Sequence, residues 1–361
     1  MPAYKDNSGK WYCSFHYSTS TGENKRKLKR GFTLKREAEE WERKFIENIS
    51  FQPIMPFSKY VDLYLKEIAP QVRLNSLRSK KYKLKQILPT FEGFPLCEIT
   101  SQQVRKWHNS LIENGFSEKY IKNLHKELSA IFNHAIRFHG LKENPCKKAG
   151  IPKVPNQEPV KMRFWTLEEY KAVISHVSDL KAFTAISLLY WTGIRKGELY
   201  ALKWQSVDFN KKTISITHSF QRIQGEDILT ATKTYQSREI SIPSLVTNQM
   251  KRYKRKCYDT SPDNYVFPYD NEFIQQGIKE GTEKANRERM EKNLPPIDRI
   301  HVHGLRHSHA SYLINHGVNI VLISKRLGHE KVSTTLDTYS HFFPKSEEAM
   351  IAMMNRDIKN E

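Results

Sequence analysis

Six side chains in the second half of the chain could act together on a phosphodiester. They are two arginines, a lysine, two histidines and a tyrosine: Arg195, Lys233, His303, Arg306, His329 and Tyr339. A guanidinium can donate two parallel hydrogen bonds to phosphate oxygens, and a tyrosine hydroxyl can form a covalent intermediate. A charged lysine can stabilise or protonate a leaving alkoxide. The set therefore predicts an enzyme that breaks a phosphodiester with its tyrosine.

Short motifs surround these residues. Arg195 lies in TGIRKGEL, His303 and Arg306 in HGLR, His329 in LGH, and Tyr339 in TTLDTYSH. In this order the motifs resemble those of the tyrosine recombinases, the integrases of phages and conjugative elements. Many members carry serine or another small residue at the position of Gly197, which is a mild departure. The resemblance covers roughly residues 160–350, and before that it is one of architecture only.

The resemblance implies a role for each residue that would act on the phosphate. Arg195 and Arg306 would hold the phosphoryl oxygens. His303 and His329 would hydrogen-bond the scissile phosphate, and His303 would also donate or accept a proton there. Lys233, expected in a β-hairpin, would protonate the leaving 5′ oxygen.

The resemblance also implies the course of the reaction. Tyr339 would form a 3′-phosphotyrosyl bond, which a 5′-hydroxyl from a partner strand would then attack. Since the covalent link keeps the bond energy, we expect no nucleotide, metal ion or other cofactor. Family members act as homotetramers on two synapsed DNA sites, so residues 341–361 would pack on a neighbouring protomer or else on their own domain. Glu198 would support the site, and His307 would be structural.

A dense group of histidines near residue 303 also invites a metal interpretation. His303 and His307 have the spacing of two metal ligands on one helix face, and His301 and His309 flank them. However, Gly304 stands where the metalloprotease motif H-E-x-x-H needs its glutamate, and no cysteine lies nearby. We therefore expect no metal ion there.

The chain is strongly basic, with 59 Lys and Arg against 39 Asp and Glu and a formal net charge of +20. Such a charge indicates a polyanionic partner, and nucleic acid is the first candidate; the family resemblance implies double-stranded DNA. The N-terminus does not resemble a signal peptide, and the most apolar stretch is far shorter than the roughly 18 residues of a membrane span. Four scattered cysteines fit reduced thiols. These features predict a cytoplasmic protein at the bacterial nucleoid, with no membrane partner.

The periodicity of apolar residues predicts a mainly α fold with small β elements, in three domains. Residues 1–50 are expected to form a β-sheet plus helix that binds arm-type DNA sites, and residues 56–147 a helical core-binding domain. A linker at 148–162 leads to a mostly helical catalytic domain with a tail at 163–361. Within the catalytic domain we expect two short strands, at 213–216 and 238–242.

Two basic clusters precede the catalytic domain. The first is a strand containing Lys25, Arg26, Lys27, Lys29 and Arg30, and the second is a helix containing Lys80, Lys81, Lys83 and Lys85. Both could contact phosphates, although lysines also protect sheet edges and cover solvated helix faces. The resemblance implies that the first domain binds arm sites and the second binds core sites, together with a host DNA-bending protein and an excisionase.

Two other functions fit parts of the same pattern. A type IB topoisomerase uses similar phosphotyrosine chemistry without bringing two DNA sites together. A DNA-binding regulator could keep the fold without the reaction, but the presence of Arg195, Lys233, Arg306 and Tyr339 argues against it. The extra N-terminal domain favours an integrase that inserts and removes a mobile element.

Overall fold

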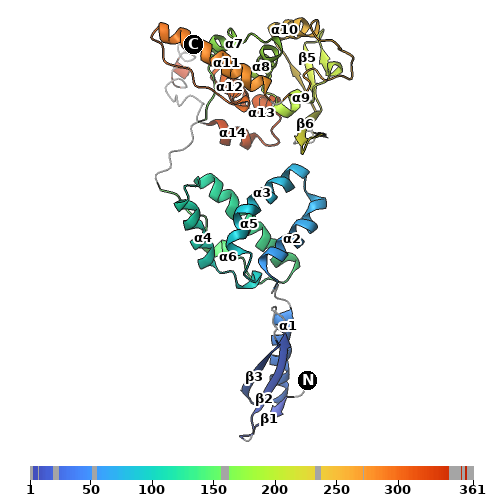
Figure 1. Ribbon diagram of the computed structural model, residues 1–361, viewed down its shortest axis with the longest axis vertical. Helices are drawn as coiled ribbons and strands as arrows, with labels where there is room; N and C mark the ends of the chain where they lie inside the picture. Colours follow the sequence, from blue (N-terminus) through green and yellow to red (C-terminus); the bar gives the residue numbers. More distant parts are fainter. Residues whose placement is uncertain are drawn as a thin grey trace. The chain divides into compact units, whose positions relative to one another are not determined.

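The computed structural model describes residues 3–6, 8–18, 24–50, 55–155, 162–231, 237–270, 272–340, 351 and 354–355 (Figure 1). The chain forms two compact units, Met1–Pro159 and Val160–Glu361, and each is described by itself. Over the described ranges, no helix combines the length and apolar character that a membrane crossing requires.

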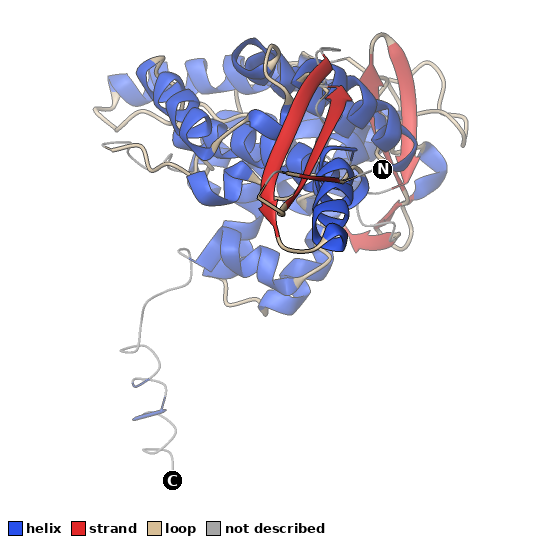
Figure 2. Ribbon diagram, turned by 90° about the horizontal axis from the view of Figure 1, so that it is seen from below, coloured by secondary structure: helices blue, strands red, loops and turns tan. Residues whose placement is uncertain are grey.

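The first part of the chain is a three-stranded antiparallel sheet covered by a helix (Figures 1 and 2). The sheet has the order β1 (Tyr4–Lys5), β2 (Trp11–Ser18) and β3 (Asn24–Phe32), and the helix is α1 (Lys35–Ser50). Along β2, Cys13 and Phe15 are buried, and the Phe15 ring contacts the ring of Trp41 on α1. The β-sheet plus helix that the sequence predicts for this part of the chain is therefore present.

Residues 57–149 form a bundle of helices: α2 (Phe57–Ile68), α3 (Leu74–Phe91), α4 (Ser101–Glu113), α5 (Glu118–Phe138) and α6 (Pro145–Ala149). A short 3-10 turn, η1 (Ala69–Gln71), continues α2. The side chain of Thr100 caps α4, and that of Ser117 caps α5, so each helix begins where a hydroxyl satisfies a free N–H group. On the apolar stripe of α5, Leu128 and Phe132 are completely buried in the core of the bundle.

The second unit is mainly helical. Its helices are α7 (Leu167–Ile174), α8 (Leu180–Thr192), α9 (Lys196–Tyr200), α10 (Ser244–Lys254), α11 (Phe273–Glu291), α12 (Val302–Asn315), α13 (Ile320–Leu327) and α14 (Val332–Tyr339). A capping box between Thr166 and Glu169 begins α7, as the sequence TLEE at 166–169 indicates. Helix α8 is apolar on nearly all sides, and α7, α10, α11 and α12 pack around it.

The described residues of this unit also form five short strands beside these helices. β4 (Val207–Asp208), β5 (Thr213–Ile216) and β8 (Arg238–Ser241) form one antiparallel sheet, and β6 (His218–Ile223) and β7 (Glu226–Ala231) form a hairpin. Both strands that the sequence predicts are present, as β5 and β8. A β-hairpin was expected at Lys233, which lies outside the described residues, but the strands of the β6–β7 hairpin were not predicted. Its turn, Gln224–Gly225, has positive φ at both residues, and glutamine in place of asparagine or aspartate leaves a weak turn signal.

Candidate active site

A cavity of about 370 Å³ in the second unit brings most of the predicted catalytic residues together. Its lining includes Arg195, His303, Arg306, His307, His329, Glu330, Thr334, Thr338 and Tyr339. These side chains come from α12, from α14 and from the segments just before α9 and α14. The sixth predicted residue, Lys233, lies outside the described residues, as does most of the tail, 341–361.

The position of Arg195 depends on a tight bend after α8. Gly193 ends that helix in the left-handed conformation, with φ of 66°. A Cβ atom at this position would lie 2.6 Å from the His309 ring and 2.8 Å from Leu327. Only glycine fits there without strain, so Gly193 allows the chain to bend after α8. The chain then turns directly into α9, with Arg195 at its N-terminal cap.

A buried carboxylate fixes two arginines, of which Arg195 lines the cavity. Glu198 is 1% exposed, and its Oε1 and Oε2 accept hydrogen bonds from Arg195 Nη1 and the Arg195 backbone N–H, both at 2.9 Å. The same oxygens accept bonds from Arg238 Nη1 and Nη2, at 3.1 and 2.6 Å. Burial alone would raise the pKa of Glu198, but these bonds and charges lower it below its ordinary value. The carboxylate therefore stays charged.

Arg238 is a site residue that the sequence did not reveal. Besides its paired bonds to Glu198, its Nε donates to the backbone oxygen of Arg326 at 3.1 Å. A Cβ atom on Gly328 would lie 2.8 Å from the Arg238 guanidinium, so the glycine leaves room for it. Arg238 thus joins strand β8 to the segment that carries His329. Forty residues separate it from Glu198, and no local motif marks that contact.

Arg306 and His329 form a second fixed pair. Arg306 is 3% exposed, donates from Nη1 to the Gly193 carbonyl at 2.7 Å, and lies with Nη2 2.8 Å from His329 Nε2. Because arginine can only donate, His329 Nε2 must accept, so the imidazole proton is on Nδ1, 2.8 Å from Thr335 Oγ1. Burial, then nearby arginines, lowers the pKa of His329 to about 4. His329 is therefore neutral at neutral pH.

The tyrosine hydroxyl has a histidine as its neighbour. Tyr339 is 1% exposed, and its hydroxyl lies 2.9 Å from His307 Nδ1. Burial raises the pKa of Tyr339, whereas the charges of Arg306 and Arg195 act in the opposite direction. Burial and the adjacent His303 and Arg306 lower the pKa of His307 to about 4, so a neutral imidazole faces the hydroxyl. The sequence predicts a structural role for His307, and its motif gives no sign of this contact.

His303 lies at the rim of the same cavity. It shares a face of α12 with Arg306 and His307, as the predicted helix requires, and its ring meets that of His307 edge-on at 4.8 Å. Its side chain is exposed, while desolvation by the surrounding helices and the charges of Arg306 and Arg195 lower its pKa. The site thus has arginine charges at its base and neutral imidazoles around the hydroxyl.

These histidines should make the second unit sensitive to acid. The pKa values of His307, His309 and His329 fall from 6.5 to about 4, 3 and 4 on folding, so the unfolded chain binds protons first as the pH drops. The unfolding free energy should therefore be highest above pH ~6.5 and decrease as the pH falls from ~6.5 to ~3. Urea denaturation at several pH values measures this, and His309→Gln should flatten the decrease. An equal slope in both proteins would contradict the prediction.

The basic strand of the first part divides between two faces. Arg26 Nε donates to Ser14 Oγ at 2.9 Å, and Arg30 lies 5.9 Å from the Tyr12 ring, on the face opposite Phe15. In contrast, Lys27 reaches over the Phe45 ring of α1, and Lys29 pairs with the buried Cys13. The face away from α1 therefore carries two arginines. The side chain of Lys25 lies outside the described residues.

The four lysines of α3 also divide into two pairs. Lys80 and Lys83 lie 2.7 and 3.2 Å from the two carboxylate oxygens of Glu127, which is 5% exposed. Lys81 and Lys85 are exposed. The cluster expected to contact phosphates thus contains two lysines that hold the bundle together and two that face solvent.

Comparison with known protein families gives three matches along the chain. Residues 163–345 match the Phage integrase family, residues 2–49 an Arm DNA-binding domain, and residues 56–112 the Phage integrase N-terminal SAM-like domain. The chain belongs to the phage integrase family and is a tyrosine recombinase. The family that the motifs indicate, the enzyme class and the mainly helical fold class are all confirmed.

Individual relatives agree with this assignment. The chain is 29% identical to the ICEBs1 integrase of Bacillus subtilis (strain 168) over 331 residues, which cover 88% of this chain and 86% of that one. Its fold is similar to that of the Tn1549 transposon integrase in complex with circular intermediate DNA, with a TM-score of 0.68 and 22% identity. The match covers 82% of this chain and 99% of that one. Its fold is also similar to that of a lambda integrase chain in a tetramer bound to a Holliday junction, with a TM-score of 0.54 and 19% identity. This match covers 91% of this chain and 96% of that one.

Proposed function

We propose that this recombinase integrates and excises a mobile genetic element through a 3′-phosphotyrosyl intermediate. One observation carries the proposal: the Tyr339 hydroxyl lines the same cavity as the guanidinium groups of Arg195 and Arg306. A phosphate between these groups would meet its nucleophile and its charge-stabilising donors at once. The relationship to the ICEBs1 integrase and to a transposon integrase supports a mobile element as the substrate.

In the first step the Tyr339 oxygen attacks the scissile phosphorus, and the bond from phosphorus to the 5′ oxygen breaks. The lone pair of neutral His307 Nδ1, 2.9 Å from the hydroxyl, is placed to accept its proton. Arg195 and Arg306 stabilise the charge on the phosphoryl oxygens, with His303 and His329 beside them. Lys233 gives its proton to the leaving 5′ oxygen, the role that the family resemblance assigns to it.

In the second step a 5′-hydroxyl from another strand attacks the phosphotyrosine and releases Tyr339. The covalent bond stores the energy of the cleaved linkage, so the reaction needs no nucleotide. The positive charge of the arginines and Lys233 also serves where other enzymes use a metal ion, so we propose no cofactor.

The proposal extends to the partners. The described residues of the first unit would bind double-stranded DNA at arm and core sites, and four protomers would act on two synapsed sites. The lambda integrase tetramer on a Holliday junction supports that assembly. We further propose a host DNA-bending protein, an excisionase, a nucleoid location, and domain boundaries at residues 1–50, 56–147 and 163–361 with a linker at 148–162.

Strand exchange tests this function directly. The protein is mixed with two labelled duplexes that carry candidate attachment sequences, and the products are separated by size. We expect recombinant strands that join the two duplexes. Relaxation of supercoiled DNA without exchange would instead indicate a type IB topoisomerase, and tight binding without either reaction would indicate a regulator.

The division of the α3 lysines gives a quantitative prediction for DNA binding. Exchanging the exposed Lys81 and Lys85 for alanine should weaken binding and reduce the slope of log Kd against log salt by about 1–2, since each phosphate contact contributes about 0.9. Lys80→Ala is the matched control, because it removes a bond to buried Glu127 and should instead lower the unfolding free energy. Equal salt slopes for wild type and the double variant would refute the assignment.

A further inference from the structure

Outside the catalytic cavity, three potential metal ligands meet in the helical domain. Glu67 Oε2 lies 3.2 Å from His134 Nε2 and 3.1 Å from His139 Nε2. The three ligand atoms all lie within 4.8 Å of one another, and each residue is partly buried. Two imidazole nitrogens and a carboxylate oxygen form a donor set that zinc and related first-row metal ions prefer.

The ends of two helices bring these residues together. Glu67 is the next-to-last residue of α2, and His139 follows the last residue of α5, with His134 one turn earlier. Helix C-termini carry partial negative charge, so a carboxylate beside two of them is unfavourable unless a positive charge compensates it. The location therefore favours a cation between the helices.

A second layer of side chains orients the first ligand. The hydroxyl of Tyr60, which is 1% exposed, lies 2.9 Å from His134 Nδ1, and the Tyr64 ring packs edge-on against the same imidazole at 5.0 Å. The two contacts direct His134 Nε2 toward Glu67. The Tyr60 hydroxyl thus occupies Nδ1, the ring nitrogen that faces away from Glu67. Metal-bound histidines typically have such a partner on the other nitrogen.

The distances agree with a bound ion. Two ligands that each lie 2.0–2.1 Å from a tetrahedral zinc ion are separated by about 3.3 Å, close to the two spacings at Glu67. We propose that Glu67, His134 and His139 bind a divalent first-row transition metal, zinc by preference, which joins α2 to α5 and leaves a fourth position for water. This site is separate from the recombination chemistry proposed above and does not depend on it.

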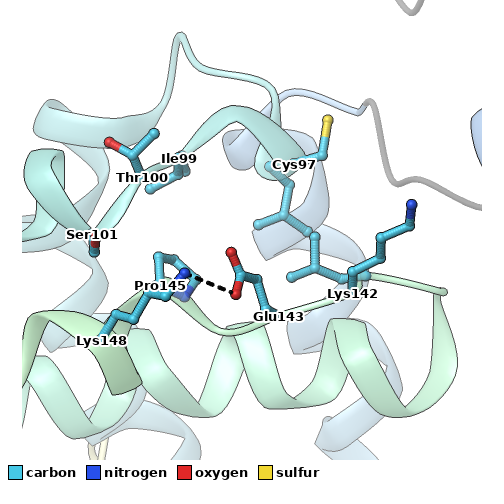
Figure 3. A pocket seen from close by; sticks show the side chains of 10 residues that line it. Cys97, Ile99, Thr100, Ser101, Lys142, Glu143, Pro145 and Lys148 are labelled. Atoms are coloured by element: carbon cyan, nitrogen blue, oxygen red, sulfur yellow. Dashed lines mark hydrogen bonds and ion pairs between the residues drawn. The ribbon is translucent and has the colours of Figure 1, made fainter.

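Another cavity in the same domain lacks such a donor set. It measures about 410 Å³ and is lined by residues that include Cys97, Thr100, Glu143 and Lys148 (Figure 3). There the Glu143 carboxylate already pairs with the Lys148 ammonium at 3.4 Å. The convergence of three ligands thus distinguishes the Glu67 cluster.

The competing interpretation is a hydrogen-bonded cluster in which both imidazoles donate from Nε2 to Glu67. The Tyr60 hydroxyl can donate to or accept from His134 Nδ1, so it suits either state. Metal titration separates the two interpretations. The full chain is treated with a chelator and titrated with Co²⁺ and then Zn²⁺, followed by visible absorption, calorimetry and Tm.

We expect one equivalent of Co²⁺ with the absorption of a tetrahedral site, its displacement by Zn²⁺, and an increase in Tm of at least roughly 3 °C. His139→Gln and Glu67→Gln should each abolish these effects, and Tyr60→Phe should weaken Zn²⁺ binding about tenfold. His176→Gln is the matched control, because His176 pairs with a single carboxylate, Glu288, at 3.3 Å, and should bind as wild type does.

The metal-free variants should show the circular dichroism of wild type, so that a loss of binding is not a loss of fold. If His139→Gln does not fold, Glu67→Gln decides the question, because its side chain is 37% exposed. The proposal would be overturned if the wild-type protein bound no equivalent of Co²⁺ or Zn²⁺ tightly. Binding that persists in both ligand variants would overturn it equally.

Discussion

Replacing Tyr339 with phenylalanine should abolish the covalent protein–DNA adduct and recombination while leaving the fold intact. The change removes one hydroxyl, whose neighbour is His307 Nδ1, and keeps the buried ring in place. The stability cost should be about 1 kcal/mol, the usual contribution of one hydrogen bond. The loss of chemistry should be complete, because no other group in the cavity can replace the nucleophile in its position. Nicked duplexes that carry attachment sequences trap the adduct, and a denaturing gel measures it.

Tyr312→Phe is a suitable control for this experiment. Tyr312 lies in the same unit on α12, where its ring packs against Trp191, but it does not line the catalytic cavity. That variant should form the adduct as wild type does. An adduct that persists in Tyr339→Phe would remove the tyrosine from its proposed role. Tight DNA binding with no adduct from wild type would instead favour a regulator.

Exchanging Glu198 for glutamine should damage both stability and activity. The buried carboxylate accepts bonds from Arg195 and Arg238, and an amide would turn a donor toward one of these guanidiniums. Two arginines would then lack their counter-charge, a loss of about 3–5 kcal/mol by comparison with other broken buried pairs. Since Arg195 would also lose its orientation, adduct formation should slow by on the order of 100-fold or more. Urea denaturation and single-turnover cleavage measure the two effects.

Glu330→Gln gives a matched comparison for stability. Glu330 lines the same cavity and undergoes the same change of charge, but its side chain is exposed. Its unfolding free energy should stay within about 0.5 kcal/mol of wild type. Arg238→Lys offers a second comparison, because lysine keeps the charge and loses the paired geometry. If the urea midpoint of unfolding is the same for Glu198→Gln as for wild type, the carboxylate does not hold the site together.

Motifs and periodicity predicted the parts of the site that are local in the chain. The glycine bend before Arg195, the helix that carries His303 and Arg306, and the helix before His329 are set by neighbouring residues. Each signal lies within one or two helical turns, so the sequence is sufficient to locate these elements. The strand that begins at Arg238 was predicted in the same way.

Contacts between distant segments could not be predicted in this way. The bond from Arg238 to Glu198 spans 40 residues, and the contact between His307 and Tyr339 spans 32. Such pairs depend on how helices and strands pack, and one sequence holds no record of that packing. The division of the α3 lysines has the same origin, because Glu127 lies on another helix. A cluster of like charges in sequence can therefore divide between core and surface.

The buried ion group at Glu198 has a consequence for how the cavity distinguishes reaction states. Arg195, Arg238 and Arg306 carry three positive charges and Glu198 one negative charge, so this set retains a net charge of +2, while His307 and His329 are neutral. A phosphodiester carries one negative charge, whereas the five-coordinate species formed by attack of a deprotonated tyrosine carries two. Fixed positive charge therefore stabilises the doubly charged species more than intact DNA, so it contributes more to the rate than to substrate affinity.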